Sequence, residues 1–306
     1  MLFRSEAVDH RAELPVDRLG QVRDRLTPEV LLQLAAVQQT PQVREAQPRV
    51  DEAVRADLEA GGPPVPAVTL QQVRTSLQRG REVEVVNHPY DGRFTFARIK
   101  YRGYGRFSGR EGPGWAHDYP DADVHLVTIM RELTAMRPFT KLGNMMGGVI
   151  LSLDDPLLFK YPVAYLSEPG GWFPTAEESK GLRAYIQKGG FLIVDDFPPN
   201  DWYTFEAAMK KSFPELNPLE MTGKEPIFDS FFKVDLTRIR RSAYGRGSFY
   251  GYYDRNDPKR RLVAIVNYSQ DVGDAWQWSG TGFMPVDVSN EAFKLGVNYI
   301  IYALTH

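Results

Sequence analysis

Cysteine is absent from this sequence of 306 residues. Its absence excludes disulfides, thiolate metal sites, iron–sulfur ligation and every mechanism that uses a cysteine nucleophile. Long apolar runs are also missing, because no segment approaches the roughly 20 residues that span a bilayer. The start, Met1 to Glu6, has no apolar core of a signal peptide. If Met1 is the true start we expect a cytoplasmic protein; if an export segment is missing, we expect a periplasmic or envelope-associated one.

Neither sign of charge is in clear excess. Lys and Arg total 37 against 39 Asp and Glu, which gives a formal net charge of −2. A chain of this kind has no global field that attracts nucleic acid or an anionic membrane surface, so we expect neither as a partner. The hydrophobic fraction of 42% is enough to bury a substantial core. We therefore expect a soluble globular protein whose partners are recognised locally.

Two regions differ in composition. Residues 1–90 are rich in Gln, Arg, Glu and Pro and poor in aromatic residues, whereas nearly all Phe, Tyr and Trp lie beyond Tyr90. Thr27-Pro28 resembles a helix start and precedes apolar residues at helical spacing. We predict a helical, partly flexible N-terminal arm over 1–90 and an α/β domain over 91–306.

The second region alternates strand and helix patterns. Thr175 to Glu178 forms a capping box, the following helix stops at Gly189-Gly190, and Phe191 to Asp195 is a continuous apolar run typical of a strand covered on both faces. Further strands are predicted at 94–101, 149–153, 162–166, 247–254 and 261–268, and further helices at 118–136, 202–213 and from Phe293 to Leu304. This order predicts a three-layer α/β sandwich with a mostly parallel, flavodoxin-like sheet and a right-handed crossover.

The carboxyl ends of parallel strands are where such sheets bind ligands. Here they are Tyr101 onward, Ser167-Glu168 and Asp195-Asp196, and we expect these loops to converge. Two carboxylates leaving a buried strand suit metal binding, acid–base work or hydrogen bonds to a sugar hydroxyl. The alternative is that one aspartate caps the next helix or turn and the other is solvated.

Two more stretches carry polar chemistry. A basic series without an acid between Gly92 and Arg110 could hold an anionic group or an acidic partner surface, and the alternative is a mobile, solvated loop; its residues are Arg98, Lys100, Arg102, Arg106 and Arg110. In the stretch from Gly114 to His125, Asp121 and His125 have a spacing that could share a metal, but Asp118 as N-cap with acids near the positive helix end explains the same residues. The glycines from Gly103 to Gly109 are rejected as a dinucleotide loop because the next helix starts too late.

These considerations give a set of candidate ligand-binding residues, with no catalytic residue assigned, no complete metal site and no cofactor expected. The candidates are Arg98, Tyr101, Trp115, His117, Asp118, Tyr119, Asp123, Ser167, Glu168, Asp195 and Asp196.

Several stretches, in the same order along the chain, resemble a bacterial family called domain of unknown function 4159 (DUF4159). They are Phe94 to Tyr101, Trp115 with Asp118-Tyr119-Pro120, Leu157 to Tyr165, Gly189 to Asp196, Pro226 to Phe228, Arg261 to Ile265 and Leu295 to Tyr299. The resemblance implies a fold like that of class I glutamine amidotransferases. It also suggests MoxR-type ATPases or von Willebrand factor A proteins as partners in a cell-envelope assembly.

Active amidotransferases need a cysteine nucleophile, so glutaminase activity is excluded here. Two hypotheses remain. The first is a non-catalytic or degenerate amidotransferase-like module that binds a ligand or a protein partner over the carboxyl-end loops. The second is a metal- or carboxylate-dependent hydrolase or carbohydrate-active enzyme that uses the Asp195-Asp196 region.

Overall fold

The computed structural model describes residues 87–103, 113–139, 148–239, 241–242 and 245–306. The predicted N-terminal arm, except for its last four residues, lies outside these ranges. So do Arg106 and Arg110 of the basic series and most of the glycine-rich stretch that precedes Gly114.

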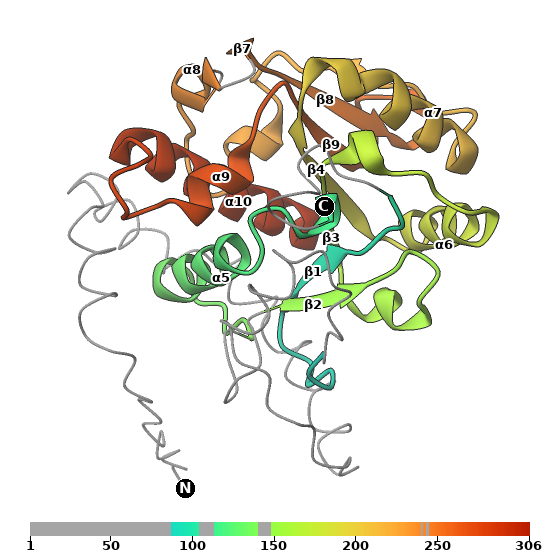
Figure 1. Ribbon diagram of the computed structural model, residues 1–306, viewed down its shortest axis with the longest axis horizontal. Helices are drawn as coiled ribbons and strands as arrows, with labels where there is room; N and C mark the ends of the chain where they lie inside the picture. The colour runs from blue at the N-terminus through green and yellow to red at the C-terminus, as the bar shows by residue number, and fades with distance from the viewer. Residues whose placement is uncertain (1–86, 104–112, 140–147, 240, 243–244) are drawn as a thin grey trace, which may run out of the picture.

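The described part of the chain is a mixed α/β structure around a seven-stranded sheet with the strand order β2-β1-β3-β4-β9-β8-β5 (Figure 1). The first five of these strands are parallel, and β8 and β5 continue the sheet in antiparallel fashion. The strands are β1 (Phe96–Ile99), β2 (Gly148–Leu151), β3 (Val163–Ser167), β4 (Phe191–Phe197), β5 (Leu219–Glu220), β8 (Ser248–Tyr253) and β9 (Leu262–Tyr268). β6 (Arg241–Ser242) and β7 (Gly245–Arg246) form a separate antiparallel pair.

The described helices are α5 (Asp121–Leu133), α6 (Ala176–Gln187), α7 (Trp202–Ser212), α8 (Leu236–Ile239), α9 (Val272–Gln277) and α10 (Val286–Thr305). Four of them (α5, α6, α7 and α10) lie where the sequence predicts a helix, although α10 begins earlier than predicted, and α8 and α9 were not predicted. Short 3-10 turns lie at η1 (Gly114–Ala116), η2 (Pro156–Lys160), η3 (Pro169–Gly171), η4 (Pro199–Asp201), η5 (Pro226–Phe228) and η6 (Asp254–Asn256). In the part of the chain that is described, no helix is both long and apolar enough to pass through a membrane.

Two hydrophobic clusters account for the core. Ile193 of β4 packs in the cluster that contains α5, α9 and α10, whereas its neighbours Leu192 and Val194 pack in the cluster that contains α6 and α7. Successive side chains of a strand point to opposite faces, so this alternation means that β4 is covered on both faces. All seven residues of β4 are buried, which confirms the predicted buried strand.

β4 does not end where the sequence analysis placed its end. The strand continues through Asp195-Asp196 to Phe197, and its register with β9 shifts between Val194 and Phe197. A shift of this kind lets one extra residue leave the regular ladder and re-aims its side chain. Phe197 is fully buried against Phe205 of α7, with ring centroids 5.1 Å apart, and this packing holds the extension of the strand.

Helix α6 begins at the predicted capping box. The Thr175 hydroxyl accepts a hydrogen bond from the backbone N–H of Glu178 at 3.1 Å, and the Glu178 carboxylate accepts one from the N–H of Thr175 at 2.7 Å. The helix ends at Gln187, and Gly189 has φ +106°, a conformation that favours glycine. The unit β3-α6-β4 is therefore a parallel β-α-β crossover, as predicted.

Candidate functional site

The three strand-end loops that the sequence singled out converge at one edge of the sheet. The Tyr101 hydroxyl donates to the backbone oxygens of Ser167 at 3.0 Å and Glu168 at 2.6 Å, so the end of β1 is bonded to the end of β3. Ser167 in turn pairs in register with Asp195 of β4. Because parallel strands end at the same edge, the loops that follow them share one site.

Arg98 holds a fourth segment, residues 113–120, against this edge. Its guanidinium is fully buried and lies 2.5 Å from Asp123 of α5, and it also donates to the carbonyls of Trp115 at 3.1 Å and His117 at 2.8 Å. Burial alone would lower the pKa of Arg98, but the carboxylate of Asp123 outweighs it and raises that pKa. Arg98 and Asp123 therefore form an internal ion pair that positions His117 and Asp118.

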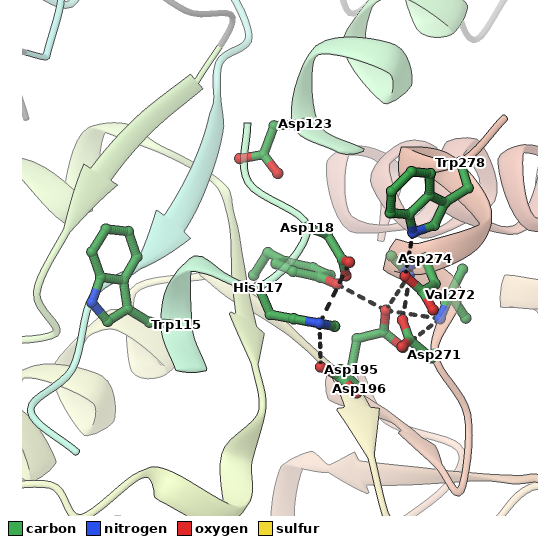
Figure 2. Close-up of polar contacts among 12 residues, drawn as sticks. Trp115, His117, Asp118, Asp123, Asp195, Asp196, Asp271, Val272, Asp274 and Trp278 are labelled. Carbon is green, nitrogen blue, oxygen red and sulfur yellow. Dashed lines mark hydrogen bonds and ion pairs between the residues drawn. The ribbon is translucent and has the colours of Figure 1, made fainter. Parts of the chain in front are cut away.

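His117 lies between two aspartates that come from different segments. Its Nδ1 is 2.8 Å from Oδ2 of Asp196 and 3.4 Å from Oδ1 of Asp118. Figure 2 shows the imidazole bridging the two carboxyls at the end of β4. The side chains of Asp118 and Asp196 are almost completely buried, whereas His117 keeps 11% of its side chain exposed. Solvent therefore reaches this cluster at the histidine.

The backbone at the site is unusual at three acidic positions. Asp118, Glu168 and Asp196 have φ values of 62°, 45° and 58°, in the left-handed region that non-glycine residues rarely adopt. The predicted role of Asp118 as N-cap of the following helix is wrong. Pro120 occupies the N-cap position of α5, and Asp118 directs its carboxyl to the cluster, while its backbone oxygen accepts from Ala122 at 3.0 Å.

Burial is the largest influence on the pKa values of Asp118 and Glu168. Burial raises the pKa of Asp118 to about 7, opposed by the charge of His117, and it raises the pKa of Glu168 to about 7, with the charge of Asp196 adding to the effect. For His117, burial would lower the pKa, but Asp118 and Asp196 outweigh it, and the pKa of the imidazole is raised. Because their pKa values are raised, His117, Asp118 and Glu168 hold their protons to a higher pH than the same groups in water.

Asp195 has a different role from its neighbour. Its carboxylate accepts hydrogen bonds from Tyr165 at 2.8 Å, Asn267 at 2.9 Å and the backbone N–H groups of Val272 and Gly273, at 3.1 and 2.8 Å for Oδ2. These two N–H groups open helix α9, so Asp195 satisfies the start of that helix. Burial nonetheless raises the pKa of Asp195, although the hydrogen bonds from Asn267 and Tyr165 act against it.

Three residues of this site were missed by the sequence analysis: Asp271, Asp274 and Trp278. Asp271 is the N-cap of α9, where its Oδ1 accepts from the N–H of Asp274 at 2.8 Å, and Oδ1 of Asp274 accepts from the indole N–H of Trp278 at 3.0 Å. Burial and the charges of Asp196 and Asp118 raise the pKa of Asp271 well above its ordinary value. The same rule of strand ends finds Asp271 once β9 is counted as a parallel strand.

Four donor groups come close enough to share one ligand. One donor atom each from His117, Asp118, Asp196 and Asp271 lies within 4.8 Å of all the others. They come from the segment before α5, from the end of β4 and from the loop that follows β9. The predicted i, i+4 pair of Asp121 and His125 is not part of this group, and Nδ1 of His125 lies 2.8 Å from the carbonyl of Trp276.

Trp115, Tyr119 and Ser167, which were also predicted as site residues, are not among the four donor residues. Trp115 is 3% exposed, and Figure 2 shows its indole away from the acidic cluster. Tyr119 lies against Arg98, whose guanidinium carbon is 5.7 Å from the centroid of its ring, and Ser167 is fully buried. Nζ of Lys100 lies 6.0 Å from the centroid of the Trp115 ring.

A match to a known protein family identifies the family to which this chain belongs. The family described as "Domain of unknown function (DUF4159)" matches residues 95–304, more than two thirds of the chain. The chain belongs to the DUF4159 family. Among curated proteins, none matches it. The matched range starts in front of β1 and ends in α10, so the DUF4159 domain contains every residue of the cluster described above.

The chemistry open to this DUF4159 domain follows from its donors. Carboxylates and an imidazole can accept hydrogen bonds from hydroxyl groups, bind a cation, or transfer protons. A cysteine nucleophile is not among them.

Proposed function

We propose that this chain is a ligand-binding module without glutaminase activity, which takes its ligand at the carboxyl edge of the parallel sheet. The observation that supports this proposal is the gathering of Asp118, Asp196 and Asp271 around His117. Burying several carboxyls together carries a large electrostatic cost, and functional sites are where proteins keep such arrangements. By contrast, the Asp195 carboxylate accepts hydrogen bonds from several protein donors, as expected for a carboxylate that stabilises the fold.

The ligand that suits the site carries hydroxyl groups and has an apolar face, as a sugar does. Carboxylates accept hydrogen bonds from hydroxyls. Beside them, Trp278 keeps 38% of its surface exposed and Phe283 keeps 72%, with ring centroids 5.4 Å apart. The hydrogen bond from the Trp278 indole to Asp274 holds the ring next to the acidic group. An aromatic face beside polar groups is a common arrangement in ligand sites.

Binding to glycans tests this proposal. The full chain would be titrated with a panel of soluble oligosaccharides and mixed with peptidoglycan sacculi, and bound protein would be measured. We expect at least one of these glycans to bind, and Trp278→Ala to weaken that binding by at least about tenfold, because the variant removes the large aromatic surface against which the apolar face of a sugar would pack. Tyr203→Ala is the matched control, because Tyr203 is 80% exposed and belongs to α7. No glycan binding, or equal loss in both variants, contradicts the proposal.

A second candidate function is hydrolysis by carboxyl acid–base chemistry at the same site. The observation that favours it is that the pKa values of Asp118 and Glu168 are raised, chiefly by burial, to about 7, where a general acid or base works best. The test is turnover of p-nitrophenyl glycosides and esters by the full chain, with and without added divalent metal. We expect Asp118→Asn to lower any such rate at least about a hundredfold. The absence of turnover on every substrate contradicts hydrolysis and leaves the binding role standing.

The proposal also covers the fold class of the domain and its protein partner. We propose that the domain is a three-layer sandwich of the class I glutamine amidotransferase type, and that a MoxR-type ATPase or a von Willebrand factor A protein docks on the loops that follow β3 and β4. Phe173 and Tyr203, at 61% and 80% exposed, support this surface. Binding of a purified MoxR-type ATPase, weakened by Phe173→Ser and Tyr203→Ser but not by Trp278→Ala, is the expected result. No binding contradicts the partner.

A further inference from the structure

The four donor groups of the cluster form a mixed set of one imidazole and three carboxylates. His117, Asp118, Asp196 and Asp271 each place a donor atom within 4.8 Å of the other three. Around a divalent cation with bonds of about 2.1 Å, donors on opposite sides lie about 4.2 Å apart. The set therefore already has nearly the dimensions of a coordination sphere, and a contraction of a few tenths of an ångström closes it.

Asp118 provides an independent indication of a ligand. The residue is 3% exposed, and both of its carboxyl oxygens are buried without a hydrogen-bond donor among the described residues. The groups that face it are Nδ1 of His117, 3.4 Å away, and the carboxyl of Asp274, which is close enough to share a proton with it. An ionised carboxylate can only accept, so a buried one needs donors or a cation. Figure 2 shows its carboxyl turned toward the cluster.

Among the described residues, no basic side chain other than that of His117 neutralises the Asp118 carboxylate by direct contact. Arg98 interacts electrostatically with Asp118, but its guanidinium is paired with Asp123 and with the carbonyls of Trp115 and His117. Gly273 is packed tightly against Asp118, because a Cβ built there would lie 2.3 Å from Oδ2 of Asp118. The backbone of Gly273 thus lies close to the Asp118 carboxylate, and the Asp118 carboxylate faces the other acidic side chains.

We propose that His117, Asp118, Asp196 and Asp271 bind one divalent transition-metal cation, Mn²⁺ or Zn²⁺. Imidazole nitrogen suits these ions, whereas Mg²⁺ and Ca²⁺ prefer oxygen donors alone. Two positive charges also offset most of the three negative charges of the donor set. In six-fold coordination, four protein donors leave two positions for water or for a hydroxyl-bearing ligand. This inference rests on the proposed function only in placing the ligand at this cluster, and it does not require that the organic ligand be a sugar.

Titration calorimetry on the full chain tests the cation site. Protein freed of metal by a chelator and then dialysed would be titrated separately with MnCl2, ZnCl2, MgCl2 and CaCl2, without any glycan. We expect Mn²⁺ or Zn²⁺ to bind with one equivalent per chain, at least about tenfold tighter than Mg²⁺ or Ca²⁺. Thermal unfolding followed in parallel is expected to show a rise in Tm with the same ions, because a ligand that binds the folded state stabilises it.

Asp118→Asn and Asp196→Asn are the informative variants. Both positions have positive φ, and asparagine tolerates that conformation, so the backbone is retained. We expect each to weaken binding of the preferred ion at least about a hundredfold, while Tm without metal stays equal or rises because one buried acid has been neutralised. Asp229→Asn is the matched control, since Asp229 is an exposed aspartate outside the donor set.

Two results would overturn the cation site. One is the absence of saturable binding for all four ions at millimolar concentration. The other is binding that Asp118→Asn and Asp196→Asn leave as strong as Asp229→Asn does. Both are distinguishable from failure of the proposed function, which glycan binding measures in the presence and absence of the ion. Cation binding without glycan binding would retain the metal site and remove the sugar ligand.

Discussion

Asp195 and Asp196 are consecutive residues of β4, yet their carboxyls lie in different surroundings. Asp195 accepts hydrogen bonds from Asn267, Tyr165 and the first N–H groups of α9, whereas Oδ2 of Asp196 lies 2.8 Å from Nδ1 of His117. The two side chains diverge where the register of β4 with β9 shifts. Asp195 therefore links β4 to β9 and to the start of α9, whereas Asp196 faces the acidic cluster.

This difference predicts opposite effects of two similar substitutions. Asp195→Ala is expected to destabilise the protein by about 3 kcal/mol or more, because several buried donors lose their acceptor. Asp196→Asn is expected to leave the free energy of unfolding unchanged or to raise it. Urea unfolding of the two variants beside wild type measures both values. A loss in Asp196→Asn as large as that in Asp195→Ala would mean that Asp196 is also needed by the fold.

The ion pair of Arg98 and Asp123 predicts a large loss when one partner is removed. Both side chains are essentially fully buried, so Arg98→Met leaves a buried carboxylate without its counter-charge, which costs about 3–5 kcal/mol. The control is Glu215→Gln, which breaks the exposed pair with Arg183 and is expected to cost less than about 1 kcal/mol. Chemical unfolding of both variants checks the contrast, and similar small losses would refute it.

Glu168 predicts a pH dependence of stability. Burial, with the charge of Asp196, raises its pKa from 4.5 to about 7 in the folded state. The folded state then binds more protons than the unfolded state between these values, so stability falls as the pH rises from about 4.5 to about 7 and stays lower above that. The contribution is up to about 3 kcal/mol, since one pKa unit corresponds to about 1.4 kcal/mol.

Glu168→Gln removes this titration. Its free energy of unfolding is expected to exceed that of wild type at pH 8 by more than it does at pH 5. Urea unfolding at the two pH values gives the difference of differences directly. A variant that follows wild type with a constant offset at both pH values would assign the pH dependence to other groups.

The capping box of α6 predicts a smaller, local effect. Thr175→Ala removes the acceptor of the Glu178 N–H and is expected to cost about 1 kcal/mol. Thr175→Ser retains a hydroxyl at the same place and is expected to recover most of the loss. Thermal or chemical unfolding of the pair measures this, and equal losses for Ala and Ser would show that the hydroxyl is not what stabilises the helix start.

The sequence was informative wherever one segment carries its own signal. Thr175 and Glu178 begin a helix by bonds to each other's backbone, and the apolar run from Phe191 can only be buried on both faces. It was less informative at Asp118, where the same residues fit a helix cap and a site. Whether Asp118 caps a helix or belongs to a site depends on Arg98, twenty residues earlier in the chain. Arg98 positions the segment before Asp118 by donating hydrogen bonds to the carbonyls of Trp115 and His117.

The sequence by itself determined the order of strands and helices, the absence of a thiol nucleophile, and the edge at which polar groups gather, because each depends on residue type and on contacts between neighbours in the chain. Only the tertiary structure decided which carboxyls meet. Asp271 joins Asp118 and Asp196 because β9 lies beside β4 in parallel. That pairing links residues more than 70 positions apart. The surroundings of a carboxyl, rather than its local sequence, decide whether it accepts hydrogen bonds from the first N–H groups of a helix, as Asp195 does, or faces His117 and other acids with no hydrogen-bond donor of that kind among the described residues, as Asp118 does.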